Sequence, residues 1–246
     1  MKYFLKNLIY FFRSYLPSSS GAVALMYHSI NNGDLFFNVF PEEFEKQMRY
    51  LRENDFNIVS LKKFRQYLIN KSLPPKTVLI TFDDGYQDNY FNAFPILKKY
   101  SLPATIFVTT GNIGKKNKIR DDVLEMLNWD HIKEMEESNL IDFEPHSVSH
   151  QKLSKIEIAE AEREIIDSTD IVEKKLNKKC LFFAYPYGAY NDKVLSIIKK
   201  NGIELAFTVK SGKINLSDNI LELNRNSIDS QVSFIQFKNI VNAGRI

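Results

Sequence analysis

Short apolar runs alternate along this chain with longer segments in which apolar residues recur every three or four positions. Residues 77–82 and 104–108 are apolar or β-branched throughout, a pattern typical of buried strands. Phe44, Met48 and Leu51 instead recur at helical spacing behind a proline and two acids, which favour the first turn of a helix. The alternation predicts repeated strand-helix units.

The same reading assigns most of the chain. We expect strands over residues 22–27, 57–60, 77–82, 104–108, 140–144, 181–185 and 204–209 and within 220–228, and helices from Pro41 onward and over 61–70, 88–100, 128–138, 156–176, 192–200 and 230–241. Pro95 should kink its helix or mark a boundary. Ser230 is the expected cap of the last helix, and the lysine-rich segment 111–120 is expected to be an exposed loop.

Polar motifs come directly after several of these strands. His28, Asp83-Asp84, His146 and Pro186-Tyr187-Gly188 all occupy such positions. Strands that alternate with helices indicate a parallel sheet, and barrels of this kind place their chemistry at the carboxyl ends of the strands. The sequence therefore predicts an α/β barrel with these residues at one end.

Composition is that of an ordinary globular protein. The chain has 246 residues, of which 44% are hydrophobic and 26% charged, and a formal net charge of +3. This small charge implies no polyanionic partner, so nucleic acid is not expected. The lone Cys180 excludes an internal disulfide and is expected to be buried.

The first residues differ from the rest. Residues 1–16 are mostly apolar and aromatic, and their basic side chains fall on one narrow helical face. The segment is too short to span a bilayer, and residues 17–21 resemble a linker. We expect an amphipathic helix on an anionic membrane surface. A helix packed on the catalytic domain and a degenerate export signal are the alternatives.

One aspartate and two histidines form a possible ligand set. Asp84, His146 and His150 offer a carboxylate and two imidazoles, which suit Zn²⁺ and also Co²⁺ or Ni²⁺. The neighbouring Asp83 would then be free to act as a base on a water bound by the metal, and His28 could donate a proton to the leaving nitrogen. The pattern indicates metal-assisted hydrolysis.

Each motif alone has an ordinary explanation. Asp83-Asp84-Gly85 could be a turn, His146 and His150 could be surface histidines, and His28 could be a core histidine. His131 has no partner in any motif and is expected on a solvated helix face. The joint occurrence of the motifs, in this order, is what favours a functional site.

These segments resemble the motifs of the polysaccharide deacetylase family, carbohydrate esterase family four, also called the NodB homology domain. Residues 81–85 (Thr-Phe-Asp-Asp-Gly), 146–150 (His-Ser-Val-Ser-His) and 183–188 (Phe-Ala-Tyr-Pro-Tyr-Gly) carry the resemblance, which covers about residues 21–246. It implies a distorted (β/α)7 barrel as one catalytic domain over 21–246, after a segment of residues 1–20. It also implies hydrolysis of N-acetyl groups from amino sugars with one divalent metal, Zn²⁺ foremost.

The resemblance also assigns roles. It implies Asp83 as the base and Asp84, His146 and His150 as the metal ligands. The N–H of Tyr187 would stabilise the oxyanion of the tetrahedral intermediate. Pro186 and Tyr187 would contact the substrate.

The chain departs from the family pattern at two places. The arginine that usually begins the third motif and orients the base is replaced by Ala184, so Arg225 or a lysine would have to orient Asp83. The C-terminal Leu-x-His motif, which supplies the acid, is absent. Its place would be taken by His28, an arrangement similar to the branch that acts on poly-N-acetylglucosamine. In that branch Trp129 would line the sugar groove.

Two alternatives to this enzyme are a sugar-binding barrel that retains the metal without catalysis and, ranked lower, a phosphoesterase. The sequence does not choose among poly-N-acetylglucosamine, peptidoglycan, a lipid-linked sugar and a lipopolysaccharide precursor as substrate, or between deacetylation and deformylation. The N-terminal segment favours the cell envelope or a membrane-associated location over the cytoplasm.

Overall fold

Parallel strands form the centre of the computed structural model, which describes residues 21–119 and 122–244. Five of them, β1 (Val23–Tyr27), β3 (Thr77–Asp84), β4 (Ala104–Val108), β7 (Ile141–Pro145) and β10 (Asn226–Ser227), pair in the order β10-β1-β3-β4-β7, and β2 (Asn57–Ile58) pairs with β3. β8 (Phe182–Ala184) pairs with β9 (Leu205–Phe207). The fold is the predicted distorted (β/α)7 barrel.

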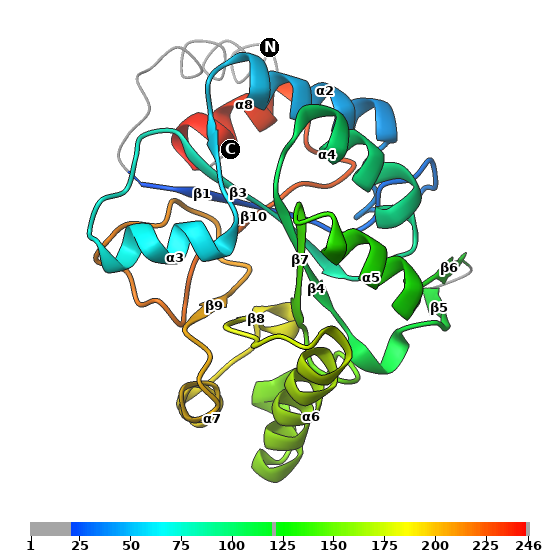
Figure 1. The fold of residues 1–246 in the computed structure, drawn as a ribbon, viewed down its shortest axis with the longest axis vertical. Coiled ribbons are helices and arrows are strands. Elements are labelled where there is room, and N and C mark those ends of the chain that lie inside the picture. The colour runs from blue at the N-terminus through cyan, green and yellow to red at the C-terminus, as the bar shows by residue number, and fades with distance from the viewer. Residues whose placement is uncertain (1–20, 120–121, 245–246) are drawn as a thin grey trace, which may run out of the picture.

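Helices cover the outside of the strands. Figure 1 shows α2 (Pro41–Glu53), α4 (Phe94–Tyr100) and α8 (Phe234–Ala243) along one side, with α3 (Leu61–Ile69), α5 (Trp129–Glu137), α6 (Ile158–Leu176) and α7 (Asp192–Lys200) around the rest. The predicted stripe Phe44, Met48 and Leu51 is fully buried on α2. The short helical turns are η1 (Asn89–Ala93), η2 (Thr110–Asn112), η3 (Leu153–Lys155) and η4 (Pro186–Gly188).

Side chains on each strand alternate between two cores. On β1, Ala24 belongs to the cluster that fills the barrel interior, as does Ala22 just before the strand, whereas Val23 and Leu25 belong to the cluster beneath the helices. The period of two along a strand produces this division. The interior cluster contains four fully buried phenylalanines, Phe64, Phe107, Phe182 and Phe207, among smaller aliphatic side chains.

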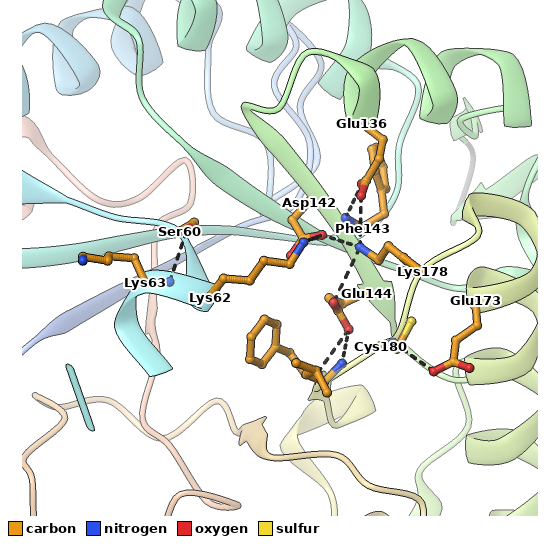
Figure 2. A network of polar contacts seen from close by, with 12 residues as sticks. Ser60, Lys62, Lys63, Glu136, Asp142, Phe143, Glu144, Glu173, Lys178 and Cys180 are labelled. Carbon is orange, nitrogen blue, oxygen red and sulfur yellow. Dashed lines mark hydrogen bonds and ion pairs between the residues drawn. The ribbon is translucent and has the colours of Figure 1, made fainter. Parts of the chain in front are cut away.

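The barrel has a seam between β7 and β8. These strands lie side by side without sharing a ladder of backbone hydrogen bonds. The Glu144 carboxylate accepts the N–H groups of Leu181 and Phe182 at 3.2 and 3.1 Å (Figure 2). At the other end His146 bonds the Ala184 carbonyl. The side chains of Glu144 on β7 and of His146, which follows β7, therefore make hydrogen bonds where the two strands share no backbone ladder.

Two sequence predictions of local structure need correction. The segment 111–120 is not simply a loop, because β5 (Lys116–Ile119) pairs with β6 (Asp122–Glu125) as an antiparallel hairpin. The last helix is capped by Ser233 rather than Ser230, through a capping box with Gln236. Ser230 instead bonds the Phe36 carbonyl.

Other predictions are confirmed. Pro95 marks a boundary, because a π-helical turn precedes it and α4 begins at Phe94. Cys180 is buried. The predicted amphipathic segment 1–16 lies outside the described residues. Among the described helices, none combines the length and apolar character that crossing a bilayer requires.

Candidate active site

Asp83 and Asp84 diverge at the end of β3. Asp83 continues the alternation of the strand and turns into the barrel, where it is buried. Asp84 has a φ of +71°, and Gly85 follows at +83°. This left-handed turn directs two adjacent carboxylates to different surroundings.

His146 is fixed at the end of β7. Its Nδ1 lies 2.7 Å from the Ala184 carbonyl oxygen, which can only accept, so Nδ1 carries the proton and Nε2 offers its lone pair. Burial lowers the pKa of His146 to about 4, so the ring is neutral near neutral pH. A neutral imidazole with a free Nε2 is suited to bind a metal.

Asp84, His146 and His150 converge on one point. Their donor atoms all lie within 4.8 Å of one another. The Asp84 Oδ1 is 3.3 Å from the His150 Nε2 and 3.8 Å from the His146 Nε2. One carboxylate and two imidazoles at this spacing fit a divalent cation of the zinc type.

Asp83 forms a buried ion pair with Arg225. The guanidinium Nη1 and Nη2 donate to Asp83 Oδ1 and Oδ2 at 2.6 and 2.7 Å, and Nε donates to the Thr208 carbonyl at 3.0 Å. Arg225 is fully buried. Of the two orienting groups that the sequence offered, Arg225 or a lysine, the structure places Arg225 on Asp83.

This pair sets the charge of Asp83. Burial by itself raises the pKa of that carboxyl, but the charge of Arg225, aided by His146 and by the guanidinium hydrogen bonds, outweighs burial. The pKa of Asp83 is held well below its usual range, and the carboxylate stays ionised. Its Oδ2 lies 3.9 Å from the His146 Nε2, beside the candidate ligand set.

His28 directly follows β1. The His28 charge also lowers the pKa of Asp83, after the larger effects of burial and Arg225, so its ring is within electrostatic reach of that carboxylate. The ring centroid is 5.7 Å from that of Phe37. The His28 carbonyl accepts the Asn89 side-chain N–H at 2.8 Å.

The third motif brings Tyr187 to the ligand set. Pro186 is buried, whereas Tyr187 is 57% exposed and has a left-handed φ of +57°. The Tyr187 ring lies 4.5 Å from the His150 ring, with the Lys152 ammonium 5.0 Å from its centroid. Gly188 is required in this turn, because a Cβ there would lie 2.8 Å from the Val209 nitrogen.

Left-handed backbone recurs in all three motifs. Asp84, Ser147, His150 and Tyr187 are non-glycine residues with φ between +57° and +71°. Each such residue costs of the order of 1–3 kcal/mol, and such strain clusters at functional sites. The surrounding hydrogen bonds hold these residues in place.

Trp129 and His131 lie on α5. Trp129 begins α5 and packs against the outer core, with the Lys175 ammonium 5.5 Å from its ring centroid. His131 does not lie on a fully solvated face, because its ring stacks on Tyr90 at 4.4 Å.

Two acidic residues near the site were not recognised from the sequence. Glu164 of α6 binds the loop between the two histidines. Asp88 binds the residues that follow His28, and it accepts the Ile30 N–H at 3.0 Å and the Ser29 hydroxyl at 2.6 Å. A single acid in a charged segment carries no local signal, so only the fold reveals these contacts.

Comparisons with known proteins identify the family of this chain. The family model described as Polysaccharide deacetylase matches residues 70–206. The chain is 34% identical over 224 residues to the poly-beta-1,6-N-acetyl-D-glucosamine N-deacetylase of Staphylococcus aureus strain MRSA252, covering 88% of this chain and 71% of that protein.

Solved structures give the same result. The Streptococcus pyogenes deacetylase PplD in complex with acetate is 29% identical with a TM-score of 0.80, and the match covers 94% of this chain and 100% of that one. IcaB from Ammonifex degensii is 28% identical with a TM-score of 0.82, covering 91% and 97%. By motifs, fold and sequence, the chain belongs to the polysaccharide deacetylase family and, within it, to the poly-N-acetylglucosamine branch.

Proposed function

We propose that this protein is a metal-dependent hydrolase that removes N-acetyl groups from N-acetylglucosamine polymers. One observation carries the proposal: a three-donor cation site, Asp84, His146 and His150, lies directly beside Asp83, a second carboxylate that Arg225 keeps ionised. A binding site needs only the donors. A hydrolase also needs a base.

The donor set favours Zn²⁺, with Co²⁺ or Ni²⁺ as possible substitutes. When bound, such a cation polarises the amide carbonyl and lowers the pKa of water. His146 presents its Nε2 because the Ala184 carbonyl holds the proton on Nδ1. His150 and Asp84 complete the set from a loop and a strand end.

Asp83 is proposed as the general base. Arg225 contacts both of its oxygens, which fixes the plane of the carboxylate and leaves further lone pairs to accept a proton from water. In this arrangement Arg225 takes over the orienting role of the arginine that the family usually has at the position of Ala184. It also favours an enzyme over the non-catalytic sugar-binding barrel, which has no need of an oriented base.

The remaining roles follow from position. His28, which follows β1 and whose charge acts on Asp83, is proposed to donate the proton to the leaving nitrogen. The Tyr187 N–H is proposed to stabilise the oxyanion, and the exposed Tyr187 ring to contact a sugar together with Pro186. Trp129 is proposed to line the sugar groove further out.

The proposed substrate rests on the relatives. The Staphylococcus aureus protein is named for poly-β-1,6-N-acetylglucosamine, and the PplD structure contains acetate, the expected product of deacetylation. We propose the same glycan class here, with residues 21–246 as the catalytic domain. We further propose a cell-envelope location and membrane contact through residues 1–16.

Acetate release tests the proposal. Purified protein given Zn²⁺ or Co²⁺ is expected to release acetate from β-1,6-linked N-acetylglucosamine oligomers and to stop when a chelator removes the metal. Asp83→Asn should keep metal binding and lose 10²–10⁴-fold in turnover, because the base is gone. Asp84→Ala should lose the metal itself.

The matched control is Asp170→Asn, which changes an exposed aspartate on α6 and should leave turnover unchanged. Formate release from N-formylated oligomers, measured alongside, separates deformylation from deacetylation. If Asp83→Asn matches the wild type, the assignment of the base is wrong. If Asp84→Ala binds as much metal as the wild type, the assignment of the metal ligands is wrong.

A further inference from the structure

A buried carboxylate behind the metal-binding loop is not explained by the chemistry proposed so far. Glu164 lies on α6 and is 8% exposed. Its Oε2 accepts the N–H groups of Val148 and Ser149 at 2.9 and 2.8 Å, and its Oε1 accepts the Ser149 hydroxyl at 2.6 Å. We propose that Glu164 is a positioning residue that holds His150 in place to bind the metal, an inference that rests on the proposed function.

The loop from His146 to His150 is supported from two sides. On one side, Thr110 and Gly111 of η2 donate their N–H groups to the carbonyls of Ser147 and Val148 at 3.1 and 2.8 Å. The Gly111 backbone lies so close to the loop that a Cβ on Gly111 would lie 2.5 Å from the Val148 oxygen. On the other side, Glu164 accepts the N–H groups. The loop is clamped between η2 and α6.

The two histidines depend on this clamp to different degrees. His146 ends β7, where its N–H donates to the Val108 carbonyl at 2.9 Å and its Nδ1 bonds Ala184. His150 lies at the far end of the loop and is positioned through the main chain, where its N–H donates to the Ser147 hydroxyl at 3.0 Å. The position of His150 therefore follows that of the loop.

The loop backbone is also strained. Ser147 and His150 have φ of +64° and +60°, a conformation that non-glycine residues rarely adopt. Such a conformation persists only where neighbouring groups over-determine it. Glu164 supplies three such contacts between the two strained residues. Without them, we expect the loop to relax and the 3.3 Å approach of His150 Nε2 to Asp84 Oδ1 to be lost.

Metal affinity is the direct test, because a residue that only stabilises the fold would not change it selectively. Co²⁺ binding is titrated by its visible absorption in full-length wild type, Glu164→Ala, Glu164→Gln and Asp84→Ala. The control is Glu160→Ala, one helical turn earlier on α6, whose carboxylate bonds Gln151 just beyond the loop at 2.9 Å. Urea denaturation of the metal-free proteins runs in parallel.

Glu164→Ala is expected to weaken Co²⁺ binding 10–100-fold, as loss of residues behind metal ligands does elsewhere. Glu164→Gln should stay within about threefold of the wild type, because its Oε1 can accept both N–H groups and its Nε2 can donate to Ser149. Glu160→Ala should match the wild type. If Glu164→Ala does not fold, Glu164→Asp, which retracts the carboxylate by one methylene, should weaken binding several-fold.

Unchanged affinity in Glu164→Ala, or in Glu164→Asp where that variant is used, would overturn the inference. An equal loss in Glu160→Ala would do the same, since it would indicate a general effect on α6. If the wild type binds Co²⁺ and Asp84→Ala does not, the proposed site stands whatever Glu164 does. If the wild type binds none, the proposed function fails together with this inference.

Discussion

The two ends of the barrel both bury charge, but they balance it differently. At the carboxyl ends of the strands, one arginine faces one aspartate, Arg225 and Asp83, through two hydrogen bonds. At the amino ends, Lys178 lies among the carboxylates of Glu136, Asp142 and Glu144, and Lys62 of α3 also contacts Asp142 (Figure 2). We call these five residues the amino-end cluster.

The amino-end cluster carries an excess of carboxylates. Lys178 bonds Asp142 closely and lies 3.3 Å from Glu136 Oε1 and 3.6 Å from Glu144 Oε1. Burial raises the pKa of Glu144 to about 8, against the opposing charge of Lys178. Burial lowers the pKa of Lys178, but its three acidic neighbours outweigh burial and raise it. Lys178 stays charged while Glu144 takes up a proton readily.

This difference suits the two tasks. A general base must stay ionised, and a planar guanidinium that contacts both carboxylate oxygens ensures this. Glu144 has a structural task, because it bridges Leu181 and Phe182 across the barrel seam. A protonated carboxyl can still accept those N–H groups. One end of the barrel therefore fixes a charge state, and the other tolerates a change in it.

Removal of Arg225 should have the largest effect. Arg225→Met leaves the buried Asp83 without its partner, and loss of one partner of a buried pair typically costs about 3–5 kcal/mol. Urea denaturation near neutral pH measures this loss of unfolding free energy. Asp83→Asn combined with Arg225→Met should recover part of the loss.

The control is Arg65→Met. Arg65 also pairs with a glutamate through two nitrogens, Glu204, but both side chains are about one-third exposed. Its loss should cost no more than about 1 kcal/mol. Equal costs for the two arginine variants would mean that burial does not distinguish these pairs.

Removal of Lys178 should cost less. Lys178→Met leaves three carboxylates, but protonation of Glu144 relieves part of the repulsion, so we expect a loss of about 1–3 kcal/mol. The loss should be larger at pH 8 than at pH 5, where more of the carboxyls are neutral. Urea denaturation at both pH values checks this. A loss equal to that of Arg225→Met at both would contradict the comparison.

The pH dependence of stability should reveal the raised pKa of Glu144. Its pKa of about 8 in the folded protein lies above its ordinary value, so the folded state binds more protons than the unfolded state. Its contribution to stability is therefore complete at acid pH and is lost as the pH rises through about 8. Between its ordinary pKa value of 4.5 and about 8, the unfolding free energy should fall relative to Glu144→Gln by up to about 1.4 kcal/mol per pH unit, and above that range the difference should level off. Parallel curves for the two proteins would contradict the raised pKa.

Lys62 should matter least. Its ammonium is 3.3 Å from Asp142 Oδ1, but the side chain is 56% exposed. Exposed ion pairs contribute about 0–1 kcal/mol, so Lys62→Ala should leave the urea midpoint nearly unchanged. A loss like that of Lys178→Met would show that the amino-end cluster depends on both lysines.

Local patterns predicted much of the fold. β4 and α7 have the bounds that the sequence indicated, because a continuous apolar run and a strong helical stripe are both local signals. The β5–β6 hairpin was missed because its strands are polar, and only pairing between them defines it. β10 is short and was located only roughly, because its strand character comes from its pairing with β1.

The chain by itself determined which residues could do chemistry: the motif order identified the family, and the strand ends grouped Asp84, His146 and His150. Only the tertiary structure decided how the neighbouring Asp83 is held, because Arg225 lies 142 positions away and no spacing rule connects them. The same holds for Glu164 and the loop that it supports. Local sequence identifies which residues can bind a metal, whereas the charge state and orientation of a side chain depend on burial and on partners that folding brings together.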